Sequence, residues 1–343
     1  MKVFFPRKVV HYTLPIKTKI IHSKNYNPYH NLALEEYLLQ QVEDNEIILY
    51  LWQNQNTIVI GKNQNPWKEC RISQVEKDGV HVARRLSGGG AVYHDLGNLN
   101  FTFLMKEKNY NLEKQLQVIL EAVKTLGIEA SFTGKNDITV HGRKFSGNAF
   151  YFGNKRSYHH GTLLIHTDMK PLSTYLQVSK EKIKSKGVDS IQSRVINLIE
   201  LNPDITIAKV IKALEESFQK IYVGSALYLP CPAEKEFSDL IKKYSSWKWR
   251  FGQSPPFDIA FENRFDFGGV ELLFSLKNSH IQQVTIYSDS IHINIFEKIK
   301  EVLTDVPFDI SSIVKQLDTI PFANQTERKI VTDIQEWLFQ IHI

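Results

Sequence analysis

Apolar residues recur along this chain with two different periods, and each period predicts a different kind of element. From Leu112 to Leu126, leucine, isoleucine and valine return every three or four positions, and Gly127 follows. This spacing puts one apolar stripe on a helix, which the glycine then ends. Two shorter runs, Ile47–Trp52 and Thr57–Ile60, are almost wholly apolar, which is typical of buried strands. Because only polar turn residues separate these two runs, they predict a β-hairpin.

The same patterns divide the rest of the chain into a larger and a smaller part. Helical spacing recurs in further segments, at residues 31–39, 67–77, 207–221, 234–244, 296–302, 310–317 and 326–338. Near the C-terminus a small antiparallel sheet is predicted from the strand patterns of Phe265–Ser275, Ile281–Ser288 and Ile291–Asn294. The tandem Pro255 and Pro256 precede them, as is typical of a domain boundary. We therefore expect an α+β protein with a large domain over residues 1–246, a linker over 247–256 and a small α+β domain over 257–343.

A glycine-rich stretch from Arg84 to Asp95 lies between two predicted strands and holds two arginines and three consecutive glycines. Glycine lets a ligand approach backbone N–H groups, successive N–H groups form a concavity for an anion, and arginine matches phosphate or carboxylate. No P-loop lysine follows the glycines, and Tyr93 stands where the dinucleotide fingerprint needs its third glycine. A plain turn between strands remains an alternative, but the two arginines favour an anion-binding loop.

Composition argues against several classes of protein. The 343 residues carry a net charge of +5 at pH 7, which suits an acidic substrate or partner but is too small to predict nucleic-acid binding. The two cysteines, Cys70 and Cys231, show no CxxC or zinc-site spacing, so we expect neither a disulfide framework nor structural zinc. No apolar run reaches membrane-spanning length, and the N-terminus lacks a signal-peptide pattern. We therefore expect a cytoplasmic protein without a membrane partner.

Three further polar clusters lie where glycines break the chain into short strand patterns, at residues 134–137, 142–149 and 159–163. With the glycine-rich stretch they supply cations and a carboxylate, namely Arg84, Arg85, Lys135, Asp137, Arg143 and Lys144. Such groups suit a nucleoside triphosphate with Mg²⁺, because group transfer from a triphosphate needs mainly positioning and charge neutralisation. His159 and His160 are adjacent on a predicted strand and point to opposite faces, so we expect one to be buried and the other to line the site.

Covalent catalysis by a protein nucleophile has little support in the sequence. A triad of Ser87, His94 and Asp95 lacks the nucleophile-elbow pattern. Cys70 falls in a predicted helix, Cys231 lies between two prolines near the linker, and neither has a histidine close in sequence. We therefore expect chemistry that does not pass through a bond to the protein.

Taken together, these motifs resemble lipoate–protein ligase A. The resemblance rests on the segments Asn27–Glu36, Arg84–Asn98, Lys135–Asp137, Gly142–Ala149 and His159–Leu164, and it extends over essentially the whole chain. It implies a large domain of mixed β-sheets flanked by helices, as in biotin and lipoate ligases, with a small C-terminal accessory domain. It also implies the reaction: lipoate and ATP form lipoyl-AMP and pyrophosphate, and a lysine of the acceptor then displaces AMP.

The resemblance also implies roles for single residues. Lys135 would be the catalytic residue, in contact with the lipoyl carbonyl and the phosphate. The nucleotide would be held by Arg85, Gly90, Ala91, Val92, Tyr93 and Lys135. Lipoate would be bound by Ser87, Gly88, Gly89, Lys135, Ser146, Gly147, Asn148, Ala149 and His160. Asp137 would help to position Mg²⁺, and the lysine-rich segment 180–187 would fold over the adenylate.

By the same resemblance, ATP with Mg²⁺ and lipoate are substrates, and no cofactor is permanently bound. The implied acceptors are apo lipoyl domains of 2-oxoacid dehydrogenase E2 subunits, the glycine-cleavage H protein, or both, and no nucleic acid is involved. Two alternatives stay open. A cysteine-dependent octanoyl or lipoyl transferase would need Cys70 or Cys231, whereas a non-catalytic lipoate- or nucleotide-binding regulator would not need the intact Arg85 and Lys135. The sequence does not decide between acceptors, or between lipoate and octanoate.

Overall fold

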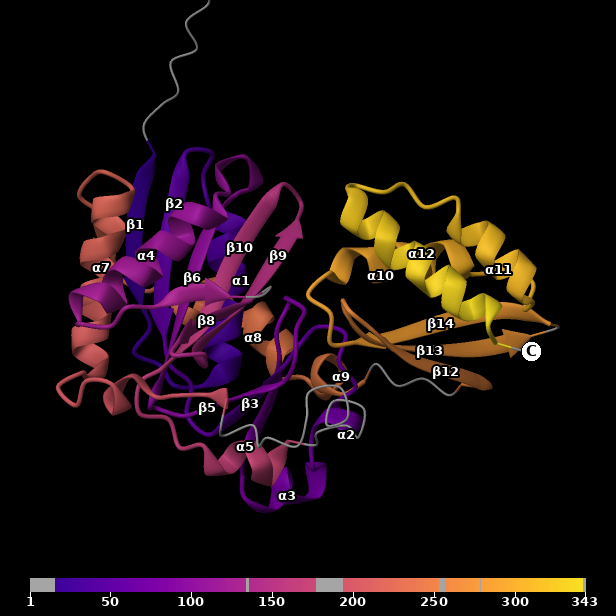
Figure 1. Ribbon diagram of the computed structural model, residues 1–343, viewed down its shortest axis with the longest axis horizontal. Coiled ribbons are helices and arrows are strands. Elements are labelled where there is room, and N and C mark those ends of the chain that lie inside the picture. The colour runs from indigo at the N-terminus through magenta and orange to yellow at the C-terminus, as the bar shows by residue number, and fades with distance from the viewer. Residues whose placement is uncertain (1–15, 134–135, 177–193, 253–256, 278, 342–343) are drawn as a thin grey trace, which may run out of the picture.

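The computed structural model describes residues 16–133, 136–176, 194–252, 257–277 and 279–341, and the statements below refer to these ranges. Figure 1 shows a larger body, which ends with α9 (Trp247–Arg250), and a smaller one, which begins with β12 (Ile259–Phe265). Both mix strands with helices, so the predicted α+β class is confirmed. The domain boundaries given above stay a prediction. Within the described ranges, no helix combines the length and the apolar character needed to cross a bilayer.

An eight-stranded sheet forms the centre of the larger body, in the order β11-β1-β2-β6-β10-β9-β8-β7. Its strands are β1 (Lys17–His22), β2 (Glu46–Trp52), β6 (Asn98–Lys106), β7 (Ser131–Thr133), β8 (Asp137–Val140), β9 (Arg143–Gly153), β10 (Arg156–Leu164) and β11 (Leu227–Leu229). β1 runs parallel to β2 and β11, and the other neighbours are antiparallel. The predicted mixed sheet is therefore confirmed.

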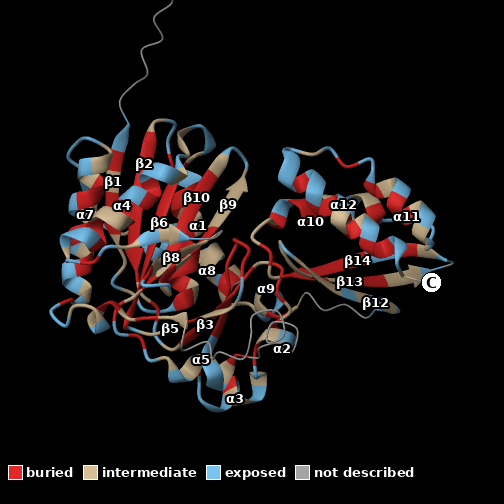
Figure 2. Ribbon diagram, viewed as in Figure 1, coloured by how far each residue is buried: buried red, intermediate tan, exposed pale blue. Residues whose placement is uncertain are grey.

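Helices cover both faces of the large sheet (Figure 1). On one face, α4 (Leu112–Thr125) and α7 (Ile207–Ile221) pack on an apolar core that includes Phe103. On the other face, α1 (Pro28–Gln41) and α8 (Ser238–Ser245) form a second core. Successive side chains of a strand point to opposite faces, so strands between two helix layers are buried on both sides, as Figure 2 shows.

Helix α1 begins earlier than the predicted segment 31–39. The side chain of Asn27 caps it, because its oxygen accepts backbone N–H groups of the first turn, and Pro28 follows. The side chain of the fully buried Asn31, one turn further on, donates to backbone carbonyls and to the side chain of Asn54. Glu35 of the same helix is also buried, and its carboxylate accepts a hydrogen bond from Thr102 on β6 of the large sheet.

The predicted hairpin is wrong. β2 pairs with β1 and β6 in the large sheet, whereas β3 (Thr57–Ile60) pairs with β4 (His81–Arg84) and β5 (Val92–His94) in a separate sheet. The segment between β2 and β3 is not an exposed hairpin turn. Its residue Asn54 is buried, and the side chain of Asn54 accepts a hydrogen bond from Asn31. Strand partners that are distant in sequence therefore override the local turn signal. The small sheet carries the glycine-rich stretch between β4 and β5.

Two predicted helices are interrupted. Residues 67–77 form α2 (Pro66–Glu69) and α3 (Ile72–Lys77), because Cys70 between them makes a strand-like bridge to Leu176. Residues 234–244 form a 3-10 turn, Glu234–Glu236, before α8 begins. The other short elements of this body are η1 (Glu107–Asn109), α5 (Lys170–Tyr175) and η3 (Leu198–Glu200). The lysine-rich segment 180–187 lies outside the described residues.

The smaller body is a three-stranded antiparallel sheet with helices on one face (Figure 1). β12 pairs with β13 (Gly268–Lys277), which pairs with β14 (His280–Ser288). The prediction of a strand at Ile291–Asn294 is wrong, since α10 (Ile293–Leu303) begins there. α10, α11 (Ile310–Leu317) and α12 (Gln325–Phe339) complete an apolar core of their own with the sheet.

The glycine-rich stretch contacts the smaller body directly. The N–H of Gly89 donates to the carbonyl of Ser290 at 3.0 Å. A Cβ placed on Gly88 would lie 2.3 Å from that same carbonyl oxygen and 2.8 Å from Ile293 Cγ2. An ion pair between Lys62 and Glu297 on α10, at 3.3 Å, adds a second contact. The first glycines of the stretch therefore permit close contact between the two bodies.

We predict that Gly88→Ala weakens this contact, whereas Gly90→Ala does not, because a Cβ on Gly90 would meet no atom within 4 Å. Overpacking of this kind costs about 1–3 kcal/mol. Thermal unfolding measures the loss of stability, and small-angle scattering measures any separation of the two bodies. Equal unfolding temperatures and equal radii of gyration for the two variants would contradict the prediction.

Candidate active site

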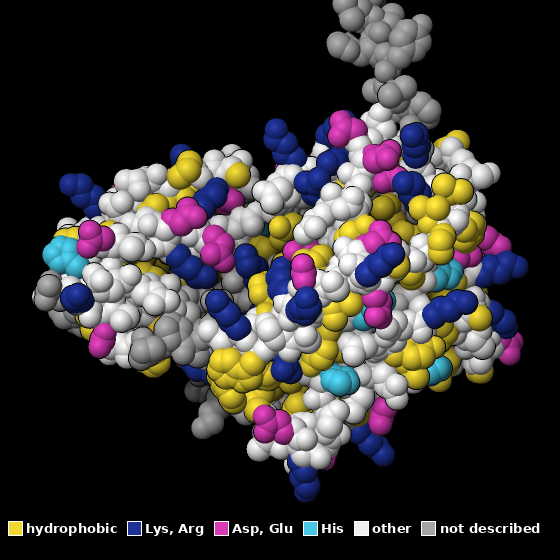
Figure 3. Space-filling model, turned by 180° about the vertical axis from the view of Figure 1, so that it is seen from behind, with side chains coloured by type: hydrophobic (Ala, Val, Ile, Leu, Met, Phe, Trp, Pro, Cys, Tyr) yellow, Lys and Arg dark blue, Asp and Glu magenta, His cyan; other side chains and the backbone are white. Residues whose placement is uncertain are grey.

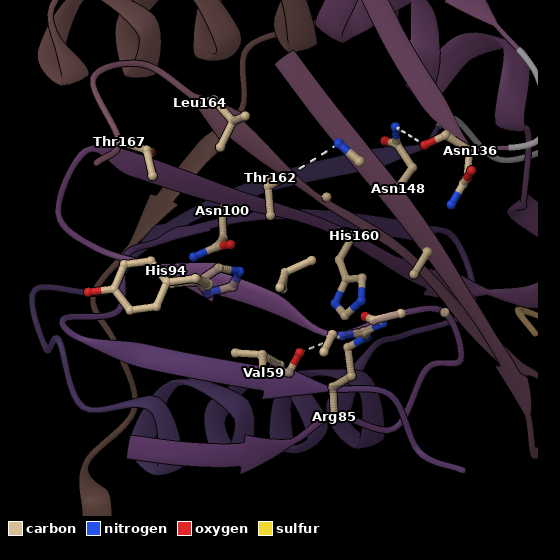
Figure 4. Close-up of a pocket in the computed structure, with 18 of the residues that line it drawn as sticks. Val59, Arg85, His94, Asn100, Asn136, Asn148, His160, Thr162, Leu164 and Thr167 are labelled. Atoms are coloured by element: carbon tan, nitrogen blue, oxygen red, sulfur yellow. Dashed lines mark hydrogen bonds between the residues drawn. The ribbon is translucent and has the colours of Figure 1, made fainter. Parts of the chain in front are cut away.

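A cavity of about 270 Å³ lies between the large sheet and the small sheet. Its floor is a row of residues across the large sheet, in which Asn100 on β6 pairs with Trp52 on β2 and with Thr162 on β10. The N–H of Gly147 on β9 donates to Thr162 Oγ1 at 3.2 Å and extends the row. Residues 89–94 form the opposite wall. The cavity thus joins three of the polar clusters in the sequence (Figure 4).

The cavity has a buried end and an open end. Apart from glycines, the buried lining residues are the apolar or aromatic Leu32, Trp52, Val59, Tyr93 and Ala149 and the polar or charged Arg85, His94, Asn100, Asn148, His160 and Thr167. Lining residues that are at least partly exposed are Gly90, Ala91, Val92, Asn136, Lys144, Leu172 and Val195. An apolar group fits beside the buried Leu32, Trp52 and Val59, and a charged group fits beside the partly exposed residues, where it keeps contact with water.

Arg85 is buried at the wall of the cavity, and its guanidinium binds backbone and hydroxyl oxygens of the protein. Nη1 donates to the carbonyl of Val59 at 3.1 Å, and Nη2 donates to those of Gly88 and Gly90 at 2.7 and 2.8 Å. Nε donates to Ser87 Oγ at 3.0 Å. Desolvation lowers the pKa of Arg85 to about 10, so it remains charged at neutral pH. Arg85 therefore shapes the glycine-rich stretch in this structure.

Lys144 on β9 provides a cation near the open end. Its Nζ lies 2.7 Å from Asp137 Oδ1, and both side chains are about one-third exposed. The neighbouring Arg143 donates to the carbonyl of Val195 and pairs with Glu200, so it does not line the cavity. Within the described ranges, Lys144 is the lysine that lines the cavity. Because this lysine is about one-third exposed and carries a positive charge, it can bind an anionic substrate.

Comparisons with known proteins agree with this arrangement. Residues 27–219 match the model of the lipoyl protein ligase A/B catalytic domain, and residues 254–338 match the bacterial lipoate protein ligase C-terminus. The chain belongs to the lipoyl protein ligase A/B family. It is 38% identical to a lipoate-protein ligase A of Psychrobacter cryohalolentis over 94% of this chain and 98% of that protein. A lipoate-protein ligase A of Blochmanniella floridana is 40% identical over 87% of this chain and 91% of its own length.

Solved structures of this family show the same fold. Plasmodium falciparum LipL1 in complex with lipoate has a TM-score of 0.84 and 34% identity, over 94% of this chain and all of that one. A lipoate-protein ligase A bound with ATP has a TM-score of 0.59 and 25% identity, over 70% of this chain and 99% of that one. The expected resemblance to lipoate–protein ligase A is therefore confirmed.

The cavity brings together most of the residues that the resemblance to this ligase family singles out. Those that line it are Arg85, Gly89, Gly90, Ala91, Val92, Tyr93, Gly147, Asn148, Ala149 and His160. Those that are described but do not line it are Ser87, Gly88, Asp137 and Ser146. Lys135 lies outside the described residues. The ligand that each of these residues binds stays a prediction.

The histidine pair divides between two environments. His159 is fully buried and bonded to Gln115 Oε1 and Asn148 Oδ1 at 3.1 and 2.8 Å. His160 faces the cavity, and Glu35 Oε1 lies 2.9 Å from its Nδ1. Glu35 was missed from the sequence, where it is one of two adjacent glutamates in a helix. The opposite orientation of the two histidines follows from the alternation of side chains along a strand.

His94 also lines the cavity, but it is no part of a catalytic triad. Asn54 Nδ2 lies 3.2 Å from His94 Nδ1, and the amide nitrogen can only donate, so Nδ1 accepts. Asp95 accepts the backbone N–H groups of Gly97 and Asp168 instead. Burial lowers the pKa of His94 to about 3, with smaller contributions from Arg85 and His160. The imidazole is therefore neutral at neutral pH.

We predict that His94 contributes to unfolding in acid. The unfolded histidine titrates near pH 6.5 and the folded one near 3, so the unfolded chain binds an extra proton between these values. The contribution of His94 to stability is complete above pH 6.5 and is lost as the pH falls. As the pH falls, the free energy of unfolding of His94→Gln should therefore decrease less steeply than that of the unmodified protein. The two slopes should differ by up to about 1.4 kcal/mol per pH unit. Denaturant titrations of both proteins between pH 7 and pH 5 measure the slopes, and parallel slopes would contradict the prediction.

Proposed function

We propose that this protein is an ATP-dependent lipoate–protein ligase. It activates lipoate with ATP to form lipoyl-AMP, and it transfers the lipoyl group to a lysine of an apo lipoyl domain. The observation that carries this proposal is one cavity that is lined by buried apolar side chains, by the partly exposed Lys144 and by the backbone of the glycine-rich stretch. Family membership supports it, and so do the solved relatives whose names include lipoate or ATP.

The apolar chain and dithiolane ring of lipoate fit the buried end, beside Leu32, Trp52 and Val59. Burial of each CH₂ contributes about 0.8 kcal/mol before ordering costs are subtracted. The carboxylate of the same molecule then lies toward the open end, where water and a cation are available. This orientation brings the reacting group next to Lys144.

Activation brings the carboxylate of lipoate against the α-phosphate of ATP, so two negative groups must approach each other. Lys144 offsets this repulsion, and in the second step it stabilises the charge that grows on the carbonyl oxygen. Residues 90–93 offer their backbone to the nucleotide, and the open space beside Gly90 leaves room for it. Lys135 was assigned this cationic role from the sequence, and its participation stays a prediction.

Asp137 is suited to Mg²⁺ that arrives with the triphosphate. Within the described ranges, no group of three His, Cys, Asp or Glu side chains is placed to hold a metal by itself. Mg²⁺ in such sites needs only one or two carboxylates, because phosphates and water supply the other ligands. Asp137 is about one-third exposed and lies next to the cavity lysine, so it fits that single-carboxylate role. The ion would neutralise phosphate charge.

The acceptor that we propose is a lipoyl domain. A solved archaeal relative is described together with its E2 lipoyl domain, and it shares 26% identity with this chain and a TM-score of 0.62. We extend the proposal to E2 subunits of 2-oxoacid dehydrogenases and to the glycine-cleavage H protein. Figure 3 shows positive and negative side chains interspersed over one face of both bodies. The cytoplasmic location and the absence of a nucleic-acid partner stay predictions.

The transferase alternative needs a reactive cysteine at the cavity. Cys70 is buried, and desolvation raises the pKa of its thiol to about 12. The thiol of Cys231 donates to the carbonyl of His22, and burial raises its pKa too. Neither cysteine lines the cavity. A thiol needs a depressed pKa and access to substrate to act as a nucleophile, so the structure favours the ligase.

We predict that Lys144→Met lowers lipoate-dependent ATP–pyrophosphate exchange by about 10²–10³-fold, as expected when one preorganised donor is removed. Lys124→Met, on the exposed surface of α4, is the matched control and should exchange normally. Lys135→Ala belongs in the same assay and should lose adenylation while the protein stays folded, as the family resemblance implies. Normal exchange by a folded Lys144→Met protein would contradict the mechanism.

We also predict that Cys70→Ala and Cys231→Ala both retain exchange and transfer to a lipoyl domain. Cys70→Ala should unfold at a lower temperature, because it removes a buried side chain from an apolar cluster. Each variant is assayed below its own unfolding temperature. A folded variant without transfer activity would restore the transferase hypothesis.

A further inference from the structure

Four polar side chains form a continuous buried chain beside the cavity. Glu35 Oε1 lies 2.9 Å from His160 Nδ1, and Ser87 Oγ lies 2.8 Å from His160 Nε2. Arg85 Nε donates to Ser87 Oγ at 3.0 Å. All four side chains are less than one-tenth exposed, and Figure 4 shows His160 next to Arg85. The chain thus connects helix α1, strand β10 and the glycine-rich stretch.

The donors and acceptors of this chain define a direction. Arg85 can only donate, so Ser87 Oγ accepts from it and has its own hydrogen for His160 Nε2. His160 then carries its proton on Nδ1 and donates it to Glu35. Glu35 Oε1 also accepts from Thr102 Oγ1 at 2.7 Å. With these assignments, each contact pairs one donor with one acceptor.

This chain of hydrogen bonds also links two opposite charges, Arg85 and Glu35, that are not in direct contact with each other. Within the described ranges, the Arg85 guanidinium donates to backbone carbonyls and to the Ser87 hydroxyl. A buried cation needs a compensating charge. Desolvation lowers the pKa of Arg85, and Tyr158 and, after it, the Glu35 carboxylate act in the opposite direction. Through Arg85, the effect of Glu35 reaches the carbonyls of Gly88 and Gly90.

We propose that Glu35 is a positioning residue for the glycine-rich stretch and acts on it through His160, Ser87 and Arg85. The arrangement holds the backbone of residues 90–93 toward the cavity. The proposal rests on the proposed function in one respect, namely that this backbone receives the nucleotide. It gives Arg85 an indirect part in nucleotide binding, because its donors already hold the protein itself.

Ser87, His160 and Glu35 have the spacing of a hydrolytic triad, but their surroundings favour the positioning role. A nucleophilic serine must reach its substrate. Ser87 is fully buried and does not line the cavity, and its oxygen accepts from Arg85. Only His160 of these three residues touches the cavity.

The test is a double-mutant cycle with Glu35→Gln and Ser87→Ala, measured by lipoate-dependent ATP–pyrophosphate exchange. Each single variant should raise the KM for ATP about tenfold with little change in kcat, the size expected when a hydrogen bond in a charged chain is lost. The KM for ATP of the double variant should be no higher than the higher of the two single-variant values, because both substitutions break the same chain of hydrogen bonds.

Glu46→Gln is the matched control: Glu46 is equally buried in the large sheet and pairs with Lys19. It should lower the unfolding temperature and leave the KM for ATP unchanged.

Three results would overturn the positioning role. They are an unchanged KM for ATP in Glu35→Gln, multiplicative losses in the double variant, or loss of kcat alone in Ser87→Ala, which would point to a nucleophile. If Glu35→Gln does not fold, His160→Gln takes its place in the cycle. If the unmodified protein shows no lipoate-dependent exchange, the proposed function fails, and binding of ATP to the same variants by calorimetry then tests the positioning role.

Discussion

The structure depends on two adjacent buried arginines, Arg84 and Arg85. Each guanidinium is hidden from water and must therefore find hydrogen-bond acceptors within the protein. Arg84 donates to carbonyls of Gly61, Lys62 and Gln64 and to those of Trp249 and Arg250 in α9. It thereby fixes the segment that leads to the smaller body. Arg85 donates within the glycine-rich stretch and to β3. Desolvation lowers the pKa of both arginines to about 10, so both stay charged at neutral pH.

The division of work between Arg84 and Arg85 has the same origin as that between His159 and His160. Neighbouring side chains on extended backbone point in opposite directions. In each pair, therefore, one member bonds to the packed interior of the larger body, and the second faces the cavity. The same alternation separates Lys144, which lines the cavity, from Arg143, which does not. In each of these adjacent pairs, therefore, one residue has a structural role and the other lines the cavity.

The glycine-rich stretch serves two surfaces at once, and this explains why three glycines stand together. A side chain on Gly88 would collide with the smaller body, and Gly89 has a positive φ of 89° and lies against Arg85. Gly90 has open space and faces the cavity. Contact between the bodies and the shape of the proposed nucleotide wall therefore depend on the same few residues. A change at one surface is expected to affect the other.

Local patterns in the sequence were enough to predict the α+β class, most of the helices, the family and the clusters around the cavity. These depend on local spacing and on short motifs such as Arg84–Asn98, which can be read without knowing what packs where. Only the tertiary structure separated β2 from β3, assigned Gly88 to an interdomain contact, placed Lys144 in the cavity, and joined Glu35 to His160. The reason is physical: strand pairing and buried hydrogen bonds form between residues far apart in the chain. Glu35 and His160 are separated by 125 positions, and no local pattern reports a partner at that distance.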